Sequence, residues 1–340
     1  MSCVGRRRRM KNKLLSLLAV GFLGLPVEQA FALGCSTYTS GVLLGPESSF
    51  DIPSIGEQIM SGGLSCEILL SALSTQYIKY KVMDIPAALI HENGINQAKI
   101  IIRDSQNTIL KNNFEKDLSE WDWLSAFNGP DNSIAFKITI NETTNLKPGV
   151  YTGTLKMKWY YYIGAVGIGG VNLWTYKSPG TLWLPFVGLV RWGTGEDSNI
   201  PLQLIVDKDC KINAQNINFG KAPLVSKFNP VTGTVQITCS AETPYSVGLS
   251  DGQNFDQTRR MLNTTGSGYL PYEIYKHTTT NRWGHLGTER WASADATFNP
   301  GIYDGSAVQG YAYTAKIIDD ASNPSVVGTY KDTLTIEVAF

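Results

Sequence analysis

Gly149-Val-Tyr-Thr-Gly-Thr-Leu-Lys-Met-Lys158 and Gly328-Thr-Tyr-Lys-Asp-Thr-Leu-Thr-Ile-Glu337 are two copies of one pattern, and this pattern decides the fold class. In each copy a Gly-x-Tyr turn is followed by alternating apolar and polar residues, which is typical of a half-buried β-strand. A cysteine pair precedes each copy, with a spacing of 31 residues for Cys35 and Cys66 and 29 for Cys210 and Cys239. The chain is therefore predicted to contain a duplicated, disulfide-pinned β-domain.

Short alternating runs recur along the whole chain, whereas long helical periodicities are scarce. The runs lie at 98–103, 134–140, 154–162, 171–176, 202–206, 234–239, 311–318 and 333–340. This pattern predicts an all-β protein with two immunoglobulin-like β-sandwich domains in tandem. The predicted boundaries are a signal peptide at 1–32, an N-terminal domain at 33–193, a linker at 194–201 and a C-terminal domain at 202–340.

The first 32 residues have the layout of a secretory signal peptide. Six basic residues precede a short apolar stretch at 14–25, and Ala30-Phe31-Ala32 fits the small-x-small cleavage pattern. The alternative is lipoprotein processing at Cys35, but Ala32 stands where leucine is usual. Removing six basic and one acidic residue from totals of 29 each leaves a net charge of −5. A mildly acidic, unclustered surface gives no electrostatic footprint for nucleic acid.

Export makes disulfides the expected state of the four remaining cysteines. The sequence alone allows three pairings among them. The repeated spacing favours pairing within each half, as Cys35–Cys66 and Cys210–Cys239.

The C-terminal half carries a series of short motifs in a fixed order. They are Cys210-Lys-Ile, Ile217-Asn-Phe-Gly220, Gly233-Thr-Val-Gln-Ile-Thr-Cys239, Tyr245-Ser-Val-Gly-Leu-Ser-Asp-Gly252, Arg260-Met-Leu-Asn263, Leu270-Pro-Tyr-Glu-Ile-Tyr275, Trp283-Gly284 and the segment 328–340. Each motif alone is weak, but together they resemble the spore coat protein U domain. This domain is found in subunits of archaic (Csu-type) chaperone–usher pili.

The resemblance implies that the C-terminal sandwich is incomplete and lacks its last strand. A periplasmic chaperone would first supply that strand, and the next pilus subunit would supply it after assembly at an outer-membrane usher. An open sheet edge is normally covered by strand addition of this kind. Leu334, Ile336, Val338 and Phe340 share one parity and are predicted to line the accepting edge. The alternative is a complete sandwich whose terminal strand is simply the last.

The N-terminal half departs from this pattern in ways that suggest a tip adhesin. After the predicted cleavage only Leu33 and Gly34 precede Cys35, which is too short for a donor strand. A subunit that accepts a strand without giving one is expected at the end of a polymer. We therefore expect a two-domain tip adhesin, exported through the periplasm to the pilus tip at the cell surface. Its N-terminal domain is expected to be self-complete, with the final strand supplied by 159–192.

Aromatic and apolar residues concentrate in the same half. Six of the eight tryptophans lie between Trp121 and Trp192, and 159–176 carries no charge. That segment reaches the minimum length of a membrane span, but the glycines at 164, 167, 169 and 170 weaken a helix. Without a helix, the segment forms either a loop packed on its own domain or an exposed finger. We favour a hairpin with an exposed apolar tip at 163–170, as the resemblance also implies.

The predicted surface-binding residues are Ile163, Ala165, Val166 and Ile168 in this finger, with Leu89, Trp123, Leu184, Phe186 and Val187 in further candidate loops. Exposed apolar patches usually mark interaction sites. The predicted function is attachment to hydrophobic or abiotic surfaces, which would promote biofilm formation. The alternative is a pilus-tip lectin that binds a glycan.

No enzyme motif organises the reactive side chains. The chain has three histidines, and it contains no HExxH, CxxC or phosphate-loop pattern. No cofactor, metal or catalytic residue is therefore predicted.

Overall fold

The computed structural model describes residues 2–3, 34–66, 76–119, 127–141, 145–168, 171–278, 280–319 and 326–340. The regular structure in these ranges consists of strands and single-turn 3₁₀ helices, so the all-β prediction is confirmed. The 3₁₀ helices span Ile52–Ser54, Pro130–Asn132, Val225–Lys227, Gly287–Glu289 and Ser293–Asp295. No helix in the described part of the chain is both long enough and apolar enough to cross a membrane.

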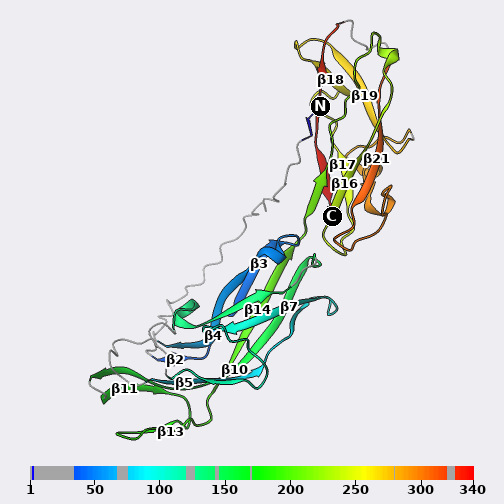
Figure 1. The fold of residues 1–340 in the computed structure, drawn as a ribbon. Coiled ribbons are helices and arrows are strands. Elements are labelled where there is room, and N and C mark those ends of the chain that lie inside the picture. Colours follow the sequence, from blue (N-terminus) through cyan, green and yellow to red (C-terminus); the bar gives the residue numbers. More distant parts are fainter. Residues whose placement is uncertain are drawn as a thin grey trace, which may run out of the picture. The chain divides into compact units, whose positions relative to one another are not determined.

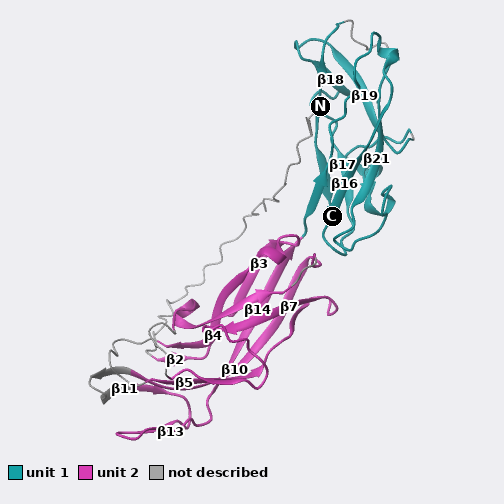
Figure 2. Ribbon diagram, viewed as in Figure 1, with its two compact units in different colours: residues 1–17, 208–340 teal, residues 18–207 magenta. Residues whose placement is uncertain are grey.

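The chain divides into two compact units (Figure 2). Each unit has its own hydrophobic core. The N-terminal unit comprises residues 18–207. The C-terminal unit comprises residues 208–340 together with 1–17. Each core is centred on packed aromatic rings: Trp159 with Tyr80 in the first, and Trp283 with Trp291 in the second.

The N-terminal unit is built around one large curved sheet (Figure 1). Its strands are β2 (Cys35–Ser36), β3 (Val42–Ser48), β4 (Glu57–Cys66), β5 (Tyr77–Asp84), β6 (Ala88–His91), β7 (Gln97–Asp104), β8 (Glu115–Asp117), β9 (Ser133–Ile140), β10 (Gly149–Ile168), β11 (Val171–Lys177), β12 (Leu182–Leu184), β13 (Gly188–Arg191) and β14 (Glu196–Asp207). The main path runs β2-β4-β9-β7-β6-β10-β14-β3, and β5 and β11 also pair with β10. β12 and β13 form a separate two-stranded ribbon.

β14 completes this unit. It pairs antiparallel with β10 from Gly149↔Val206 to Trp159↔Glu196, and its other edge pairs parallel with β3. Alternate side chains enter the core, with Ile200, Leu202, Leu204 and Val206 all at most 3% exposed. The unit is therefore self-complete, as predicted from the sequence.

The strand that completes the unit is not the predicted one. The expected linker at 194–201 lies largely within β14, and the final strand comes from 196–207 instead of 159–192. The units divide between Asp207 and Lys208. The reason is local: the outward positions of β14 begin with polar residues such as Asp197 and Asn199, which resemble a linker although the inward positions are buried.

The C-terminal unit contains two sheets. Its strands are β15 (Cys210–Asn213), β16 (Val231–Cys239), β17 (Ser246–Leu249), β18 (Arg259–Asn263), β19 (Tyr269–Lys276), β20 (Trp291–Ala292), β21 (Gln309–Ile317), β22 (Tyr330–Lys331), β23 (Thr333–Leu334) and β24 (Ile336–Ala339). One sheet has the order β15-β16-β21-β19-β18-β22 and the other β20-β17-β24. In addition, β1 (Ser2–Cys3) pairs parallel with β23.

The internal repeat appears twice in the structure. Cys35 is bonded to Cys66 and Cys210 to Cys239, so the predicted pairing is confirmed. In both units these cysteines lie opposite each other in the register of the first antiparallel strand pair.

The two Gly-x-Tyr turns repeat as well. The Tyr151 hydroxyl donates to the Lys147 carbonyl at 2.8 Å, and the Tyr330 hydroxyl donates to the Val326 carbonyl, again four residues upstream. This is the tyrosine-corner arrangement found in immunoglobulin-like sandwiches.

Candidate functional site

The β12–β13 hairpin carries the most exposed large apolar side chain among the described residues, Phe186. Its turn is made by Pro185, Phe186 and Val187, and the Val187 amide donates to the Leu184 carbonyl at 3.2 Å. Phe186 and Gly188 have φ values of 64° and 89°. A Cβ atom at Gly188 would also lie 2.9 Å from the Tyr77 hydroxyl oxygen, so the Tyr77 side chain would have to shift.

The side chains of this turn face solvent. Phe186 is fully exposed at 109%, Val187 is 70% exposed and Leu184 is 42% exposed. Leu182 and Val190 on the flanking strands are also exposed. A cluster of this size usually marks an interaction site, because soluble proteins rarely leave such apolar surface in contact with water.

A group of aromatic rings fixes the base of the hairpin. Trp183 stacks on Tyr162 of β10 with 5.3 Å between ring centroids and 14° between planes. Trp192 packs edge-on against Tyr77 of β5 and Tyr160 of β10. Lys79 lies over the Tyr160 and Trp192 rings at 4.7 and 5.0 Å. These contacts hold an exposed loop on a rigid base.

Hydrogen bonds secure the segment that enters the hairpin. The Thr181 hydroxyl donates to the Trp192 carbonyl at 2.8 Å and lies 2.8 Å from the buried Ser178 hydroxyl. On the neighbouring β10, the Tyr161 hydroxyl donates to the Glu196 carboxylate at 3.0 Å. Burial and the adjacent Glu196 charge raise the pKa of Tyr161, so this phenol stays neutral and keeps donating.

The predicted finger at 163–170 is a strand for most of its length. β10 continues to Ile168 and pairs with β11, so the predicted hairpin exists. Ile163, however, is fully buried in the N-terminal core, and its prediction as an exposed contact residue is wrong. The reason is the buried Gln76, which holds the adjacent backbone of Gly164 inside the unit. The Gly164 amide donates to the Gln76 side-chain oxygen at 3.1 Å, and the Gln76 side-chain nitrogen donates to the Gly164 carbonyl at 3.3 Å.

The remaining predicted contact residues divide into three groups. Leu184, Phe186 and Val187 are exposed, as their predicted role requires. Leu89 is fully buried in the core, so its prediction as a contact residue is wrong. Ala165, Val166 and Ile168 have their backbone in β10, but their side chains lie outside the described part, as does the whole of Trp123.

The C-terminal unit has an apolar pocket beside its open edge. The pocket is lined by Ala214, Gln215, Ile217, Val235, Leu249, Ile274, Trp283, Tyr313, Leu334 and Ile336. β24 pairs with β17 along one edge, and in the described ranges no strand pairs with its other edge. The pocket therefore lies where the N-terminal unit holds β14.

The predicted edge residues follow a gradient of burial. Leu334 and Ile336 are 1% and 6% exposed and line the pocket, and Val338 is half-buried. Phe340 is 49% exposed, with the Lys208 ammonium 5.4 Å from its ring. Leu334 and Ile336 therefore lie in the core and Val338 packs against it, as the common parity predicts, whereas Phe340 does not.

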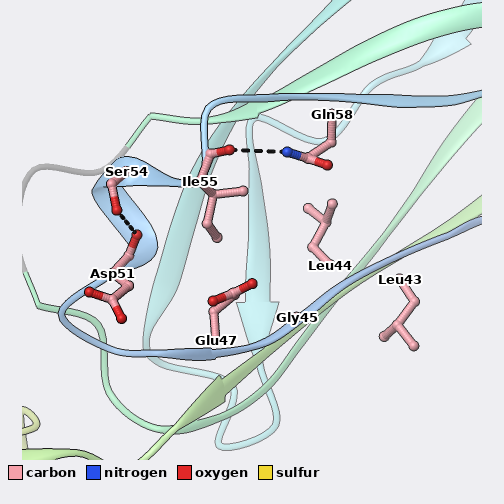
Figure 3. Close-up of a pocket in the computed structure, with 8 residues that line it drawn as sticks. All are labelled: Leu43, Leu44, Gly45, Glu47, Asp51, Ser54, Ile55 and Gln58. Carbon is pink, nitrogen blue, oxygen red and sulfur yellow. Dashed lines mark hydrogen bonds between the residues drawn. The ribbon is translucent and has the colours of Figure 1, made fainter.

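A polar hollow of ≈ 300 Å³ lies on the N-terminal unit between β3 and the turn before β4 (Figure 3). Its polar side chains are largely tied to the backbone or open to solvent. The Ser54 hydroxyl donates to the Asp51 carbonyl at 2.7 Å, and the Gln58 amide donates to the Ile55 carbonyl at 3.0 Å. No group of His, Cys, Asp or Glu residues suited to a metal ion occurs among the described residues.

Comparison with known proteins identifies the family of this chain. The Spore Coat Protein U domain model matches residues 197–337. The comparison with solved structures matches one chain of the CsuC–CsuE complex, a chaperone–tip adhesion subunit pre-assembly complex from the archaic chaperone–usher Csu pili of Acinetobacter baumannii. That chain and this one are 34% identical in sequence. The match covers 90% of this chain and 100% of that chain, with a TM-score of 0.68. The chain belongs to the tip-adhesin family of archaic chaperone–usher pili.

Two more distant adhesins match only weakly. The CupB6 tip adhesin of Pseudomonas aeruginosa and CfaE, the adhesive subunit of CFA/I fimbria of enterotoxigenic Escherichia coli, are both 10% identical with TM-scores of 0.28. Their matches cover 89% and 87% of this adhesin and 97% and 96% of those chains. A comparison with curated protein sequences found no match. The adhesin's family is structural and not enzymatic, as predicted.

Proposed function

We propose that this adhesin attaches pili to hydrophobic surfaces through the β12–β13 hairpin and so promotes biofilm formation on them. The observation that carries the proposal is the exposed apolar turn Leu184–Val187 on a rigid aromatic base. A Phe side chain buries about 150–250 Å², which corresponds to roughly 4–6 kcal/mol before association costs. By this measure one hairpin binds only modestly, and multivalent attachment by many pili would give the cell a strong overall attachment.

The composition of the hairpin favours an apolar target over a glycan. From Leu182 to Val190 the only side chain able to form a hydrogen bond is Trp183, and its ring is stacked on Tyr162. Recognition of a sugar requires several polar groups that converge on one ring. We therefore favour surface attachment over the lectin alternative.

Substitution at the tip tests the proposal. Phe186→Ser and Val187→Ser should leave the thermal melt of the full chain unchanged and reduce attachment of piliated cells to polystyrene. Ile95→Ser is the matched control, because Ile95 is 78% exposed on a different turn of the same unit. Normal attachment by the Phe186 variant, or equal loss in the Ile95 control, would remove this hairpin from the proposal.

We further propose that the C-terminal pocket accepts a strand, first from a periplasmic chaperone and then, after passage through the usher, from the next pilus subunit. The open edge of β24 and the apolar lining formed by Leu334 and Ile336 support this proposal. Addition of a peptide with alternating apolar residues should keep the isolated C-terminal unit monomeric and give it a cooperative thermal melt. A peptide with the same composition but without the alternation is the control, and equal effects of the two would contradict strand addition.

A further inference from the structure

Three chemical layers follow one another along the β12–β13 hairpin. The tip is apolar, with Phe186 and Val187 exposed. Next come the Trp183 indole and the Tyr162 phenol on which it stacks. Tryptophan and tyrosine are the residues that concentrate at membrane–water interfaces, because one end of each ring is apolar and the other is polar.

The third layer is cationic. Between Lys158 and Glu196 the chain has two charged residues, Lys177 and Arg191, and both are basic. Lys177 ends β11 and Arg191 ends β13, and both are exposed. The Arg191 guanidinium donates to the Gly180 carbonyl at 3.2 Å, which keeps it at the turn that joins the two hairpins.

Neither cation has an acidic partner within the described residues. Two acidic groups of this sheet are engaged elsewhere: Glu115 pairs with Lys79 at 2.7 Å, and Glu196 accepts the Tyr161 hydroxyl. Other lysines of this unit are paired, for example Lys156 with Asp84 and Lys158 with Asp197. The apolar tip is therefore backed by uncompensated positive charge.

We propose that this hairpin docks on the surface of an anionic lipid bilayer, with Lys177 and Arg191 at the level of the lipid phosphates. The charge of these residues and the order of the layers both fit that partner. Amphipathic elements bury their apolar part about 5–10 Å into the boundary between headgroups and acyl chains. Three strand steps from Gly188 to Arg191 span about 10 Å, so the guanidinium reaches the headgroup layer when the tip is immersed.

This inference uses the hairpin of the proposed function but adds a charge preference, which an inert hydrophobic surface does not require. Each cation near an anionic leaflet should strengthen binding about fivefold, and the effect should weaken as salt screens it. The full-length exported protein, isolated with any periplasmic partner that co-purifies, should float with vesicles of phosphatidylcholine and phosphatidylglycerol. It should float far less with vesicles of phosphatidylcholine alone.

Two double variants separate the charge effect from the apolar effect. Lys177→Gln with Arg191→Gln should lose the preference for anionic vesicles, by about 25-fold in apparent affinity, while attachment to polystyrene persists. Lys221→Gln with Lys227→Gln is the matched control, because it removes two exposed cations from the C-terminal unit. This control should bind vesicles like the wild type.

The outcomes distinguish this inference from the proposed function. Equal binding to neutral and anionic vesicles, absence of vesicle binding, or equal losses in the two double variants would overturn the bilayer inference and leave surface attachment standing. Conversely, if Phe186→Ser attaches to polystyrene normally, the proposed function fails, even where the anionic preference is observed.

Discussion

The strands that follow the two Gly-x-Tyr turns have very different neighbours. Strand β10 is paired with β14 along one edge and with β5 and β6 along the other. Of the corresponding strands, β23 pairs with the two-residue β1 and β24 with β17, and both lie beside an apolar pocket. Equivalent positions show the result: Leu155 and Leu334 are both buried, but Trp159 is fully buried where Val338 is only half-buried. A strand pattern specifies which residues face inward, while the neighbouring strand decides whether that face is covered.

Removal of β14 should leave the N-terminal unit incomplete, as the C-terminal unit is, and this is the largest effect we expect. Burying one Leu, Ile or Val side chain contributes about 1.5–3 kcal/mol. Ile200, Leu202, Leu204 and Val206 together therefore contribute on the order of 6–12 kcal/mol, comparable to the whole stability of a typical domain. An N-terminal unit that ends before Glu196 should aggregate, whereas one that ends at Asp207 should melt cooperatively.

A peptide of residues 196–207 added in trans should restore the truncated unit. Light scattering and thermal melting follow both steps. The isolated C-terminal unit, Lys208–Phe340, provides the comparison and should aggregate without an added donor. A truncated N-terminal unit that remains monomeric and cooperative would show that β14 is dispensable, and the contrast between the units would disappear.

Replacing leucine by alanine at the two equivalent positions sharpens the comparison. Leu155→Ala should destabilise the N-terminal unit by about 2–5 kcal/mol, because the site is closed on all sides. Leu334→Ala should cost less in the free chain, since Leu334 lines an open pocket, and more once a donor strand is bound. Denaturant titrations with and without a donor peptide measure this difference. Equal costs for Leu334→Ala in the two conditions would argue against strand binding at this pocket.

Much of this architecture could be predicted from local sequence. The repeated Gly-x-Tyr turn predicted the duplication, and the repeated cysteine spacing predicted both disulfides. Both are local patterns, since each copy lies within a single continuous segment of the chain. β14 was misplaced since the polar residues Asp197 and Asn199 on its outer face resemble a linker. Ile163 was misassigned because the residue that pins its neighbour Gly164, Gln76, is 88 residues away. The exposed turn at Phe186 carried a usable signal, since Pro185 and Gly188 bracket two apolar residues in a short hairpin.

The acid response should differ between the native N-terminal unit and an Asp104 variant. Burial would raise the pKa of Asp104, but bonds from Lys116, the Thr108 amide and the Tyr80 hydroxyl outweigh it and lower the pKa. A lowered folded-state pKa means that this carboxylate stabilises the unit above its unfolded value of about 3.9, and that the contribution is lost as pH falls through the folded value.

Asp104→Asn should therefore lower the unfolding free energy of the unit at neutral pH by about 1–3 kcal/mol. The unfolding free energy of the variant should also fall less steeply as the pH is lowered. Unfolding free energies measured from neutral to acidic pH test this expectation. Parallel curves for the variant and the native unit would assign the acid response to other carboxylates.

The smallest expected effect compares the two tyrosine corners. Tyr151→Phe removes a hydroxyl that donates to the Lys147 carbonyl from a fully buried ring, and it should cost about 1 kcal/mol. Tyr330→Phe removes the equivalent bond to Val326, but Tyr330 is only half-buried and Val326 is 39% exposed. Water can therefore replace the lost donor at Val326, and the cost should be only a few tenths of a kcal/mol. Chemical denaturation of the full chain with a bound donor peptide resolves the two transitions. A larger cost for Tyr330→Phe than for Tyr151→Phe would mean that the second corner, and not the first, holds its turn in place.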